Sequence, residues 1–174
     1  MVTLYYGCFP DGAAGSRRLL DRAAQERGAR WELTHDAAGK PLIPEGPEIS
    51  ISHTKGAAAL AVSDDPVGVD IEQIRPVRPN LPQRVMSPRE FLWYQETGER
   101  DEAFFTLWTL KESYYKYLGT GLPGFPNETE FHPEGGIWRL EGSPLRFSVY
   151  RTDNLVLALC TRERGIRLIR WEES

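Results

Sequence analysis

The chain has 174 residues, of which 40% are apolar and 26% charged, proportions typical of a globular protein and not of a disordered or fibrous one. Its longest apolar runs, 57–62 and 155–160, are far shorter than the ~20 residues that cross a bilayer, which excludes a membrane protein. The net charge of -4 argues against a nucleic-acid partner, and residues 1–20 contain no apolar targeting segment, so we expect a cytoplasmic protein.

The first 72 residues are predicted to form five strands and one helix. The strands are expected over residues 1–9, 31–34, 49–52, 57–62 and 67–72, and the helix over residues 16–27. Ser16 is the expected N-cap of this helix, and Gly28 ends it. The two apolar runs on either side of Asp64-Asp65-Pro66 predict a β-hairpin.

The second part of the chain is predicted to contain helices followed by strands. Residues 73–88 carry four prolines and no periodicity, which predicts a crossing loop with at most one helical turn near Gln83. Ser87 and Glu90 form a capping-box pattern, and a longer helix is expected over 101–118. Four more strands are expected over 137–140, 145–151, 155–161 and 166–171. This order of elements predicts an α+β fold.

Two cysteines, Cys8 and Cys160, lie in apolar segments that resemble strands. They show no metal-ligand spacing, and nothing near them indicates cysteine catalysis. We therefore expect two reduced thiols buried in the core.

Two acidic residues lie on one predicted strand, in the segment Gly68-Val69-Asp70-Ile71-Glu72. Because Asp70 and Glu72 are two apart, their carboxylates leave the same face of the strand. Two like charges in an apolar strand need a cationic partner, and Mg²⁺ is typically held by a few carboxylates together with substrate phosphates. An exposed strand face paired with arginine is the alternative.

The helical segment 108–116 adds a third carboxylate. Glu112 and Lys116 lie one turn apart on the same side as Trp108 and Tyr115, which favours a buried, functional face. Glu112 would then reach the same ion while lysines meet a polyanion. An ordinary Glu112–Lys116 surface pair is the alternative.

Ser52 and His53 follow each other at the end of a predicted strand. Neighbouring strand residues point to opposite faces, and no G-x-S-x-G motif occurs, so a serine hydrolase is disfavoured. His53 is either a structural residue or a phosphate contact.

Five motifs in this order resemble the 4'-phosphopantetheinyl transferases, in particular the longer, pseudo-dimeric type of nonribosomal peptide and polyketide systems. They are Gly39-Lys40-Pro41, Ser50-Ile51-Ser52-His53, Gly68-Val69-Asp70-Ile71-Glu72, Trp108-x-x-Lys111-Glu112-Ser113-x-x-Lys116 and Gly119-x-Gly121-Leu122. The agreement extends from about Ser16 to Gly124. The resemblance implies one monomeric domain of two pseudo-symmetric α+β halves, about 1–66 and 67–174, with coenzyme A between them.

The resemblance also implies an activity: transfer of the phosphopantetheine arm of coenzyme A to a serine of an apo acyl or peptidyl carrier protein, releasing 3',5'-ADP. Asp70, Glu72 and Glu112 would bind Mg²⁺, or Mn²⁺ in its place. Glu90 would be the base for the carrier serine, with a helix-capping role as the alternative, and Glu112 and Lys116 would also take part in catalysis. The residues expected to contact phosphates are Lys40, Ser52, His53, Lys111 and Lys116.

The chain departs from this family before its first helix, where longer relatives carry a basic segment and this sequence has only residues 10–15. Arg17 and Arg18 are the expected substitutes for binding coenzyme A, and solvated surface arginines are the alternative. We expect weak discrimination between coenzyme A and its 3'-dephospho form. A non-catalytic relative that binds coenzyme A or carriers, and a metal-dependent pyrophosphate hydrolase, remain alternative functions.

Residues 73–89 are predicted to be a docking strip for an acidic carrier protein, because they contain basic residues and no acidic one. The basic residues are Arg75, Arg78, Arg84 and Arg89, and the apolar residues expected to contact the carrier are Leu81, Val85 and Met86. An ordinary solvent-facing connection is the alternative.

Overall fold

The structure, a computed structural model, describes residues 1–121, 126–152 and 154–172. The helices are α1 (Gly12–Glu26), α2 (Leu81–Val85), α3 (Pro88–Glu96) and α4 (Arg100–Leu118), with a 3-10 turn, η1, at Pro126–Glu128. The strands are β1 (Val2–Cys8), β2 (Thr34–His35), β3 (Pro41–Leu42), β4 (Glu48–Thr54), β5 (Ala57–Ser63), β6 (Val67–Gln73), β7 (Phe131–Glu134), β8 (Ile137–Leu140), β9 (Arg146–Thr152), β10 (Leu155–Thr161) and β11 (Ile166–Arg170).

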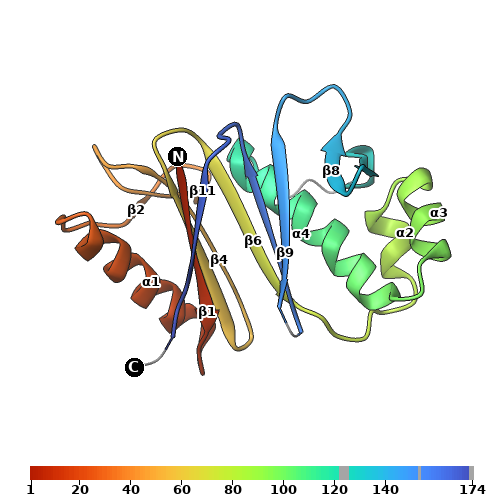
Figure 1. Cartoon of the computed structure of the whole chain (residues 1–174), viewed down its shortest axis with the longest axis horizontal. Helices are drawn as coiled ribbons and strands as arrows, with labels where there is room; N and C mark the ends of the chain where they lie inside the picture. Colours follow the sequence, from red (N-terminus) through yellow and green to blue (C-terminus); the bar gives the residue numbers. More distant parts are fainter. Residues whose placement is uncertain (122–125, 153, 173–174) are drawn as a thin grey trace.

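Two main sheets form the centre of the molecule (Figure 1). One has the order β11-β1-β5-β4, the other has the order β6-β10-β9-β8-β7, and β2 and β3 form a small separate pair. Helix α1 packs on β4 and β5, and α4 packs on β6 and β10, so each sheet has its own covering helix. The α+β fold expected from the sequence is confirmed.

The faces of the two sheets that are turned away from these helices share one apolar core. Leu4 of β1 and Ala59 of β5 lie in the same cluster as Val69 of β6 and Leu157 of β10. All four side chains are buried, and together they remove a large apolar area from water. The two sheets are therefore halves of one packed unit.

Strands β4 and β6, an edge strand of each main sheet, contact each other without a backbone ladder. Instead, Ser50 Oγ accepts a hydrogen bond from the Val69 N–H at 2.9 Å, and Ser52 Oγ accepts one from the Ile71 N–H at 3.4 Å. Buried backbone N–H groups need an acceptor, and here alternate hydroxyls of β4 provide it. The edges of the two sheets are thus joined through side chains.

Strand β11 crosses from the second half of the chain to the first sheet. It runs parallel to β1, with Val2 opposite Ile166 and Tyr6 opposite Arg170. The division into halves of about 1–66 and 67–174 therefore describes the sheets except for this strand, and the pseudo-symmetry of the halves remains a prediction.

The predicted hairpin over 57–72 is wrong. Strand β5 pairs with β1 and β4, whereas β6 pairs with β10, so the hairpin is formed by β4 and β5. Every residue of β5 is buried, as are the first five of β6, and strands buried on both faces do not indicate by their sequence which strand is the partner.

The boundaries of two elements near the N-terminus differ from those predicted. Helix α1 begins at Gly12 because the Asp11 carboxylate accepts hydrogen bonds from the N–H groups of Ala13 and Ala14. Ser16 is therefore inside the helix, where its hydroxyl donates to the Gly12 carbonyl. Of the predicted strand over 31–34, only Thr34 lies in a strand, at the beginning of β2.

Strand β7, in the second part of the chain, was not predicted.

The structure also corrects the exposure that was expected for Cys8 and for two residues of the docking strip. Cys160 is buried as expected, but Cys8 is exposed at the end of β1. Val85 and Met86 are each 3% exposed and belong to the core, so they do not offer apolar contact to a partner.

The single helical turn expected near Gln83 is present as α2. No described helix is long and apolar enough to span a bilayer.

Candidate active site

Asp70 is the centre of the predicted metal site and is 4% exposed. Its Oδ1 accepts hydrogen bonds from Ser52 Oγ at 2.7 Å and from Lys116 Nζ at 2.8 Å. Its Oδ2 is buried and has no hydrogen-bond partner in the described part of the chain. A buried carboxylate oxygen without a partner is a candidate ligand for a cation.

Glu72 follows on the same face of β6 and repeats this arrangement. Its Oε2 accepts hydrogen bonds from Thr54 Oγ1 at 3.2 Å and from Arg75 Nη1 at 3.1 Å. The Arg75 guanidinium also lies over the ring of Phe105, 4.6 Å from its centre. Each carboxylate of β6 thus has one hydroxyl partner from β4 and one cation.

Glu112 reaches this region from α4, which can approach β6 closely because position 68 is glycine. A Cβ at Gly68 would overlap the backbone of Ser113 and Tyr117. Burial raises the pKa of Glu112, and the negative charges of Asp70 and Glu72 raise it further. The three predicted ligands are therefore close enough to interact electrostatically.

The residues present fit a divalent cation, although they do not form a ready-made cage. Among the described ranges, no three Asp, Glu, His or Cys side chains are close enough to surround an ion. In this arrangement Lys116 neutralises Asp70, and Arg75 neutralises Glu72. The oxygen-only donor set and the unpartnered Asp70 Oδ2 suit a hard ion such as Mg²⁺.

A cavity of about 210 Å³ is lined by residues of four of the five sequence motifs, and among them is Lys116, the ion-pair partner of Asp70. Lys40 and Lys116 both line it, and Lys40 Nζ is 3.3 Å from the Glu48 carboxylate. The remaining lining residues are Ala38, Gly39, Pro41, Ile49, Ser50, Ile51, Tyr115, Gly119 and Gly121. We call this space the lysine pocket. Two ammonium groups beside a carboxylate cluster suit a ligand that carries both phosphate and metal.

Ser52 and His53 occupy different environments. Ser52 is buried, and its hydroxyl donates to Asp70, so here it contacts a predicted metal ligand. His53 is exposed and lies next to Gly12, at the beginning of α1. Leucine 122, the last residue of the fifth motif, lies outside the described residues.

The predicted coenzyme A contacts on α1 are not brought to the lysine pocket. Arg17 and Arg18 are exposed, and Arg17 Nε is 3.4 Å from the Asp21 carboxylate, one turn along the helix. Arg17 lines a separate hollow with Trp31 and residues around Gly28. Their proposed role remains a prediction.

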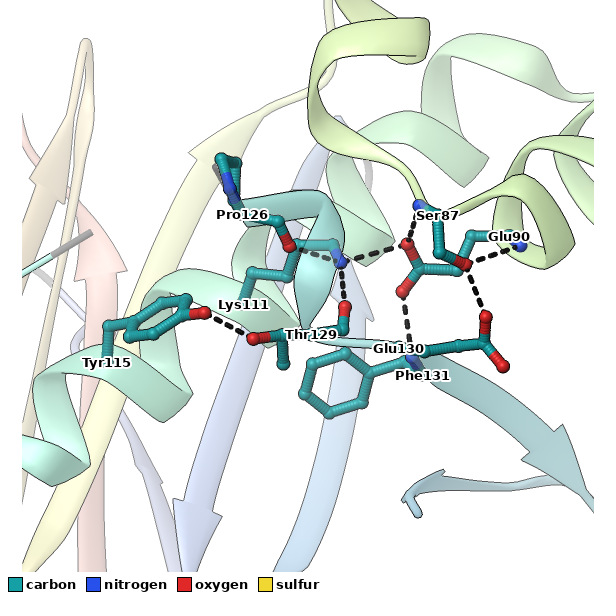
Figure 2. A network of polar contacts seen from close by, with 8 residues as sticks. All are labelled: Ser87, Glu90, Lys111, Tyr115, Pro126, Thr129, Glu130 and Phe131. Atoms are coloured by element: carbon teal, nitrogen blue, oxygen red, sulfur yellow. Dashed lines mark hydrogen bonds and ion pairs between the residues drawn. The ribbon is translucent and has the colours of Figure 1, made fainter. Parts of the chain in front are cut away.

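Glu90 and Lys111 lie together in a buried polar network (Figure 2). Both side chains are 0% exposed, and Lys111 Nζ is 2.9 Å from Glu90 Oε2. Burial raises the pKa of Glu90 and lowers that of Lys111, and each charge partly offsets the effect on the other. Neither residue lines the lysine pocket.

Two residues of the site, Thr54 and Glu48, were not singled out from the sequence. Thr54 holds Glu72, and Glu48 pairs with Lys40. A signal for Thr54 was available, because Ser50, Ser52 and Thr54 alternate along one face of a strand.

Comparison with known proteins shows which family the chain belongs to. Residues 66–160 match the model of the 4'-phosphopantetheinyl transferase superfamily. The 4'-phosphopantetheinyl transferase Sfp of Bacillus subtilis (strain 168) is 35% identical over 172 residues, covering 90% of this chain and 76% of that protein. The chain belongs to the 4'-phosphopantetheinyl transferase superfamily. This confirms the resemblance found in the sequence.

Other members of the superfamily match over shorter regions. The transferase gsp of Aneurinibacillus migulanus is 35% identical over 86 residues, which are 48% of this chain but only 36% of that protein. The match to ffp of Bacillus subtilis covers 49% of that protein. The chain thus spans half or less of the length of these two relatives.

A solved structure shares the fold. The holo-[acyl-carrier-protein] synthase of Neisseria meningitidis superposes with a TM-score of 0.50 at 17% identity, covering 56% of this chain and 97% of that chain. At this identity the likeness concerns the fold alone.

Proposed function

We propose that this protein transfers the 4'-phosphopantetheine arm of coenzyme A to a serine of an apo acyl or peptidyl carrier protein, with release of 3',5'-ADP. The observation that carries the proposal is the position of Asp70 and Lys116, which join the carboxylate cluster to the lysine pocket. Membership of the superfamily supports it. We expect the protein to act as a cytoplasmic monomer.

The charges of the site residues, together with a bound cation, are complementary to the negative charge of a pyrophosphate. Asp70, Glu72 and Glu112 would hold Mg²⁺, or Mn²⁺, which neutralises charge on the phosphates when bound. Lys40 and Lys116 would donate hydrogen bonds to phosphate oxygens. Lys116 would have to leave Asp70 Oδ1 for a phosphate, a short movement of a flexible side chain that is 29% exposed.

The reaction needs no nucleophile from this chain. The hydroxyl oxygen of the carrier serine attacks the phosphorus next to the pantetheine, a new P–O ester bond forms, and the bond to 3',5'-ADP breaks. The serine hydroxyl gives its proton to water, and the leaving phosphate of 3',5'-ADP takes the electron pair of the broken P–O bond and its negative charge. The enzyme contributes positioning and charge stabilisation, which are the main catalytic effects in phosphoryl transfer.

Incubation with coenzyme A, Mg²⁺ and an apo carrier protein tests the proposal by mass spectrometry. A carrier that gains one phosphopantetheine, together with free 3',5'-ADP, is the expected result. Formation of 3',5'-ADP without a modified carrier would instead indicate a pyrophosphate hydrolase. Coenzyme A binding without either product would indicate a non-catalytic relative.

We also propose residues 73–89 as the docking strip for the carrier. Arg78 and Arg84 are exposed, and Arg78 borders a cavity of about 290 Å³ that also contains Leu81 and Trp108 and reaches Glu72. A carrier bound here would therefore lie beside the proposed metal ligands. Arg75 differs from the other arginines of the strip because it is bound to Glu72.

A further inference from the structure

The buried network around Glu90 and Lys111 has no part in the chemistry described so far (Figure 2). Glu90 is the third residue of α3, and Lys111 lies in the middle of α4. A buried ion pair is expensive to desolvate, and removal of one partner leaves an uncompensated charge. The presence of such a pair next to the site calls for a role.

The structure leaves neither side chain free to contact a substrate. Glu90 Oε1 accepts a hydrogen bond from the Phe131 N–H at 2.8 Å, while Oε2 accepts one from the Ser87 N–H at 2.8 Å and contacts Lys111. The Lys111 ammonium donates to the carbonyl oxygens of Pro126 and Thr129 as well as to Glu90. Its three N–H donors are thus all used inside the protein.

These contacts hold three segments of the chain against one another. Glu90 fixes the beginning of α3, Lys111 fixes α4, and together they hold the backbone of residues 126–131. One turn further along α4, the Tyr115 hydroxyl bonds to the Thr129 side chain. Tyr115 lines the lysine pocket, and its neighbour Lys116 reaches Asp70.

We propose that Glu90 and Lys111 are positioning residues, which fix α4 against residues 126–131 so that Tyr115 and Lys116 face the lysine pocket. Neither residue touches a substrate in this role. The inference rests on the proposed function, and it replaces the roles that the family resemblance implied, namely Glu90 as base and Lys111 as phosphate ligand.

A double-mutant cycle separates positioning from catalysis. Glu90→Gln and Lys111→Met each keep the approximate shape of the side chain but leave the other charge buried without its partner. Each single variant should therefore melt at a lower temperature than the native protein and transfer more slowly. The double variant has no unpaired charge, so it should be more stable than either single variant.

The decisive measurement is kcat for transfer in the four proteins at saturating coenzyme A and carrier. If Glu90 positions α4, the double variant should regain most of the rate lost by Glu90→Gln and come within about tenfold of the native protein, a difference of about 1.4 kcal/mol in barrier. If Glu90 is the base, removing Lys111 as well cannot restore a lost proton acceptor. A folded double variant that stays a hundredfold or more below the native rate would overturn the inference, since general-base catalysis is worth roughly 10²–10⁴.

Two further measurements keep the test decisive. If the double variant does not fold, the pH dependence of kcat for Glu90→Gln decides, because loss of a base removes the decline of rate at low pH, whereas loss of a positioning residue lowers the rate and keeps the shape of the profile. Glu96→Gln, in the last position of α3, is the control for a neutralised carboxylate on the same helix and should behave as the native protein.

The results that would contradict this inference differ from those that would contradict the proposed function. Absence of transfer by the native protein would contradict the function, and the melting temperatures of the four proteins would still measure the coupling between Glu90 and Lys111. A double variant that folds but is no more stable than either single variant would contradict the positioning role by itself.

Discussion

The two carboxylates of β6 are each held by one side chain of the neighbouring strand. Ser52 donates to Asp70, and Thr54 donates to Glu72, so hydroxyls at every second residue of β4 meet carboxylates at every second residue of β6. A cation completes each group, Lys116 for Asp70 and Arg75 for Glu72. This arrangement would orient the proposed ligands before an ion binds.

Asp70→Asn tests the central ligand. The amide keeps the size of the side chain but loses the charge that would bind Mg²⁺, so transfer should fall by about a hundredfold or more. Thermal unfolding should show a folded protein, because removal of one carboxylate relieves repulsion from Glu72 and Glu112. Rates measured over a range of Mg²⁺ concentrations check this. Asp64→Asn, in an exposed turn, is the control, and an unchanged rate for Asp70→Asn at saturating Mg²⁺ would contradict a role for Asp70 in metal binding.

The two thiols should react at very different rates. Cys8 is exposed, whereas burial raises the pKa of the Cys160 thiol far above its ordinary value, and only a thiolate attacks a disulfide reagent. In the folded protein a coloured disulfide reagent should therefore label one thiol quickly and the second only on unfolding. Cys8→Ser should abolish the rapid phase, and two rapid thiols in the native protein would contradict the position of Cys160.

At the residue scale, the sequence predicted the members of the site better than their partners. The spacing of Asp70 and Glu72 identified a shared strand face correctly, and the structure brings Lys40 and Lys116 to one pocket. Lys111 could not be placed, because a helix face is defined by periodicity but its covering element is not. The segment 126–131 that covers it is distant in sequence and carries no motif.

At the element scale, the approach of α4 to β6 depends on a single glycine. The backbones touch where Gly68 faces Ser113 and Tyr117, and this contact sets the distance between Asp70 and Lys116. A side chain at this position has to push the helix away from the strand.

Gly68→Ala should therefore damage both stability and activity. The added methyl overlaps backbone atoms that cannot rotate away, so we expect a loss of about 3 kcal/mol in the free energy of unfolding. Denaturant unfolding and transfer assays measure the two effects. Gly98→Ala is a matched control, because a Cβ there meets nothing within 4 Å, and it should be neutral. A native-like Gly68→Ala variant would show that the contact is looser than described.

The docking strip is best tested at two arginines that have no role in the carboxylate cluster. Arg78→Glu combined with Arg84→Glu reverses two exposed charges and leaves Arg75 on Glu72. The KM for the carrier should rise several-fold at low ionic strength and less at high salt, because screening weakens charge steering. The KM for coenzyme A should stay the same. Carrier kinetics that do not change at low salt would place the docking surface elsewhere.

Prediction of the elements succeeded where the signal was local. The capping box of Ser87 and Glu90 and the end of α4 at Gly119, which has a φ of 72°, follow from sequence and are present. Strand pairing is not local, and the fully buried β5 gave no indication that β6 would leave for another sheet. The cap of α1 was misplaced because Ser16 was taken as the N-cap, whereas the structure has Asp11 in this position.

At the scale of the whole molecule, the apolar core shared by both sheets should make them unfold together. Leu157 of β10 lies in a cluster that includes Leu4 and Ala59 of the first sheet. Leu157→Ala should lower the free energy of unfolding by about 2–5 kcal/mol. Hydrogen exchange should show the same decrease in the free energy of opening for the slowly exchanging amides of β1 and of β10. A loss confined to β10 would show that the sheets open independently.

The parallel pairing of β1 with β11 affects how the protein is made. Val2 finds its partner only when Ile166 has left the ribosome, so one edge of the first sheet stays open throughout the synthesis of the intervening chain. Contacts between such distant residues slow folding, and open strand edges attract other strands. We therefore expect nascent chains that lack β11 to aggregate readily and to depend on chaperones until this strand closes the sheet.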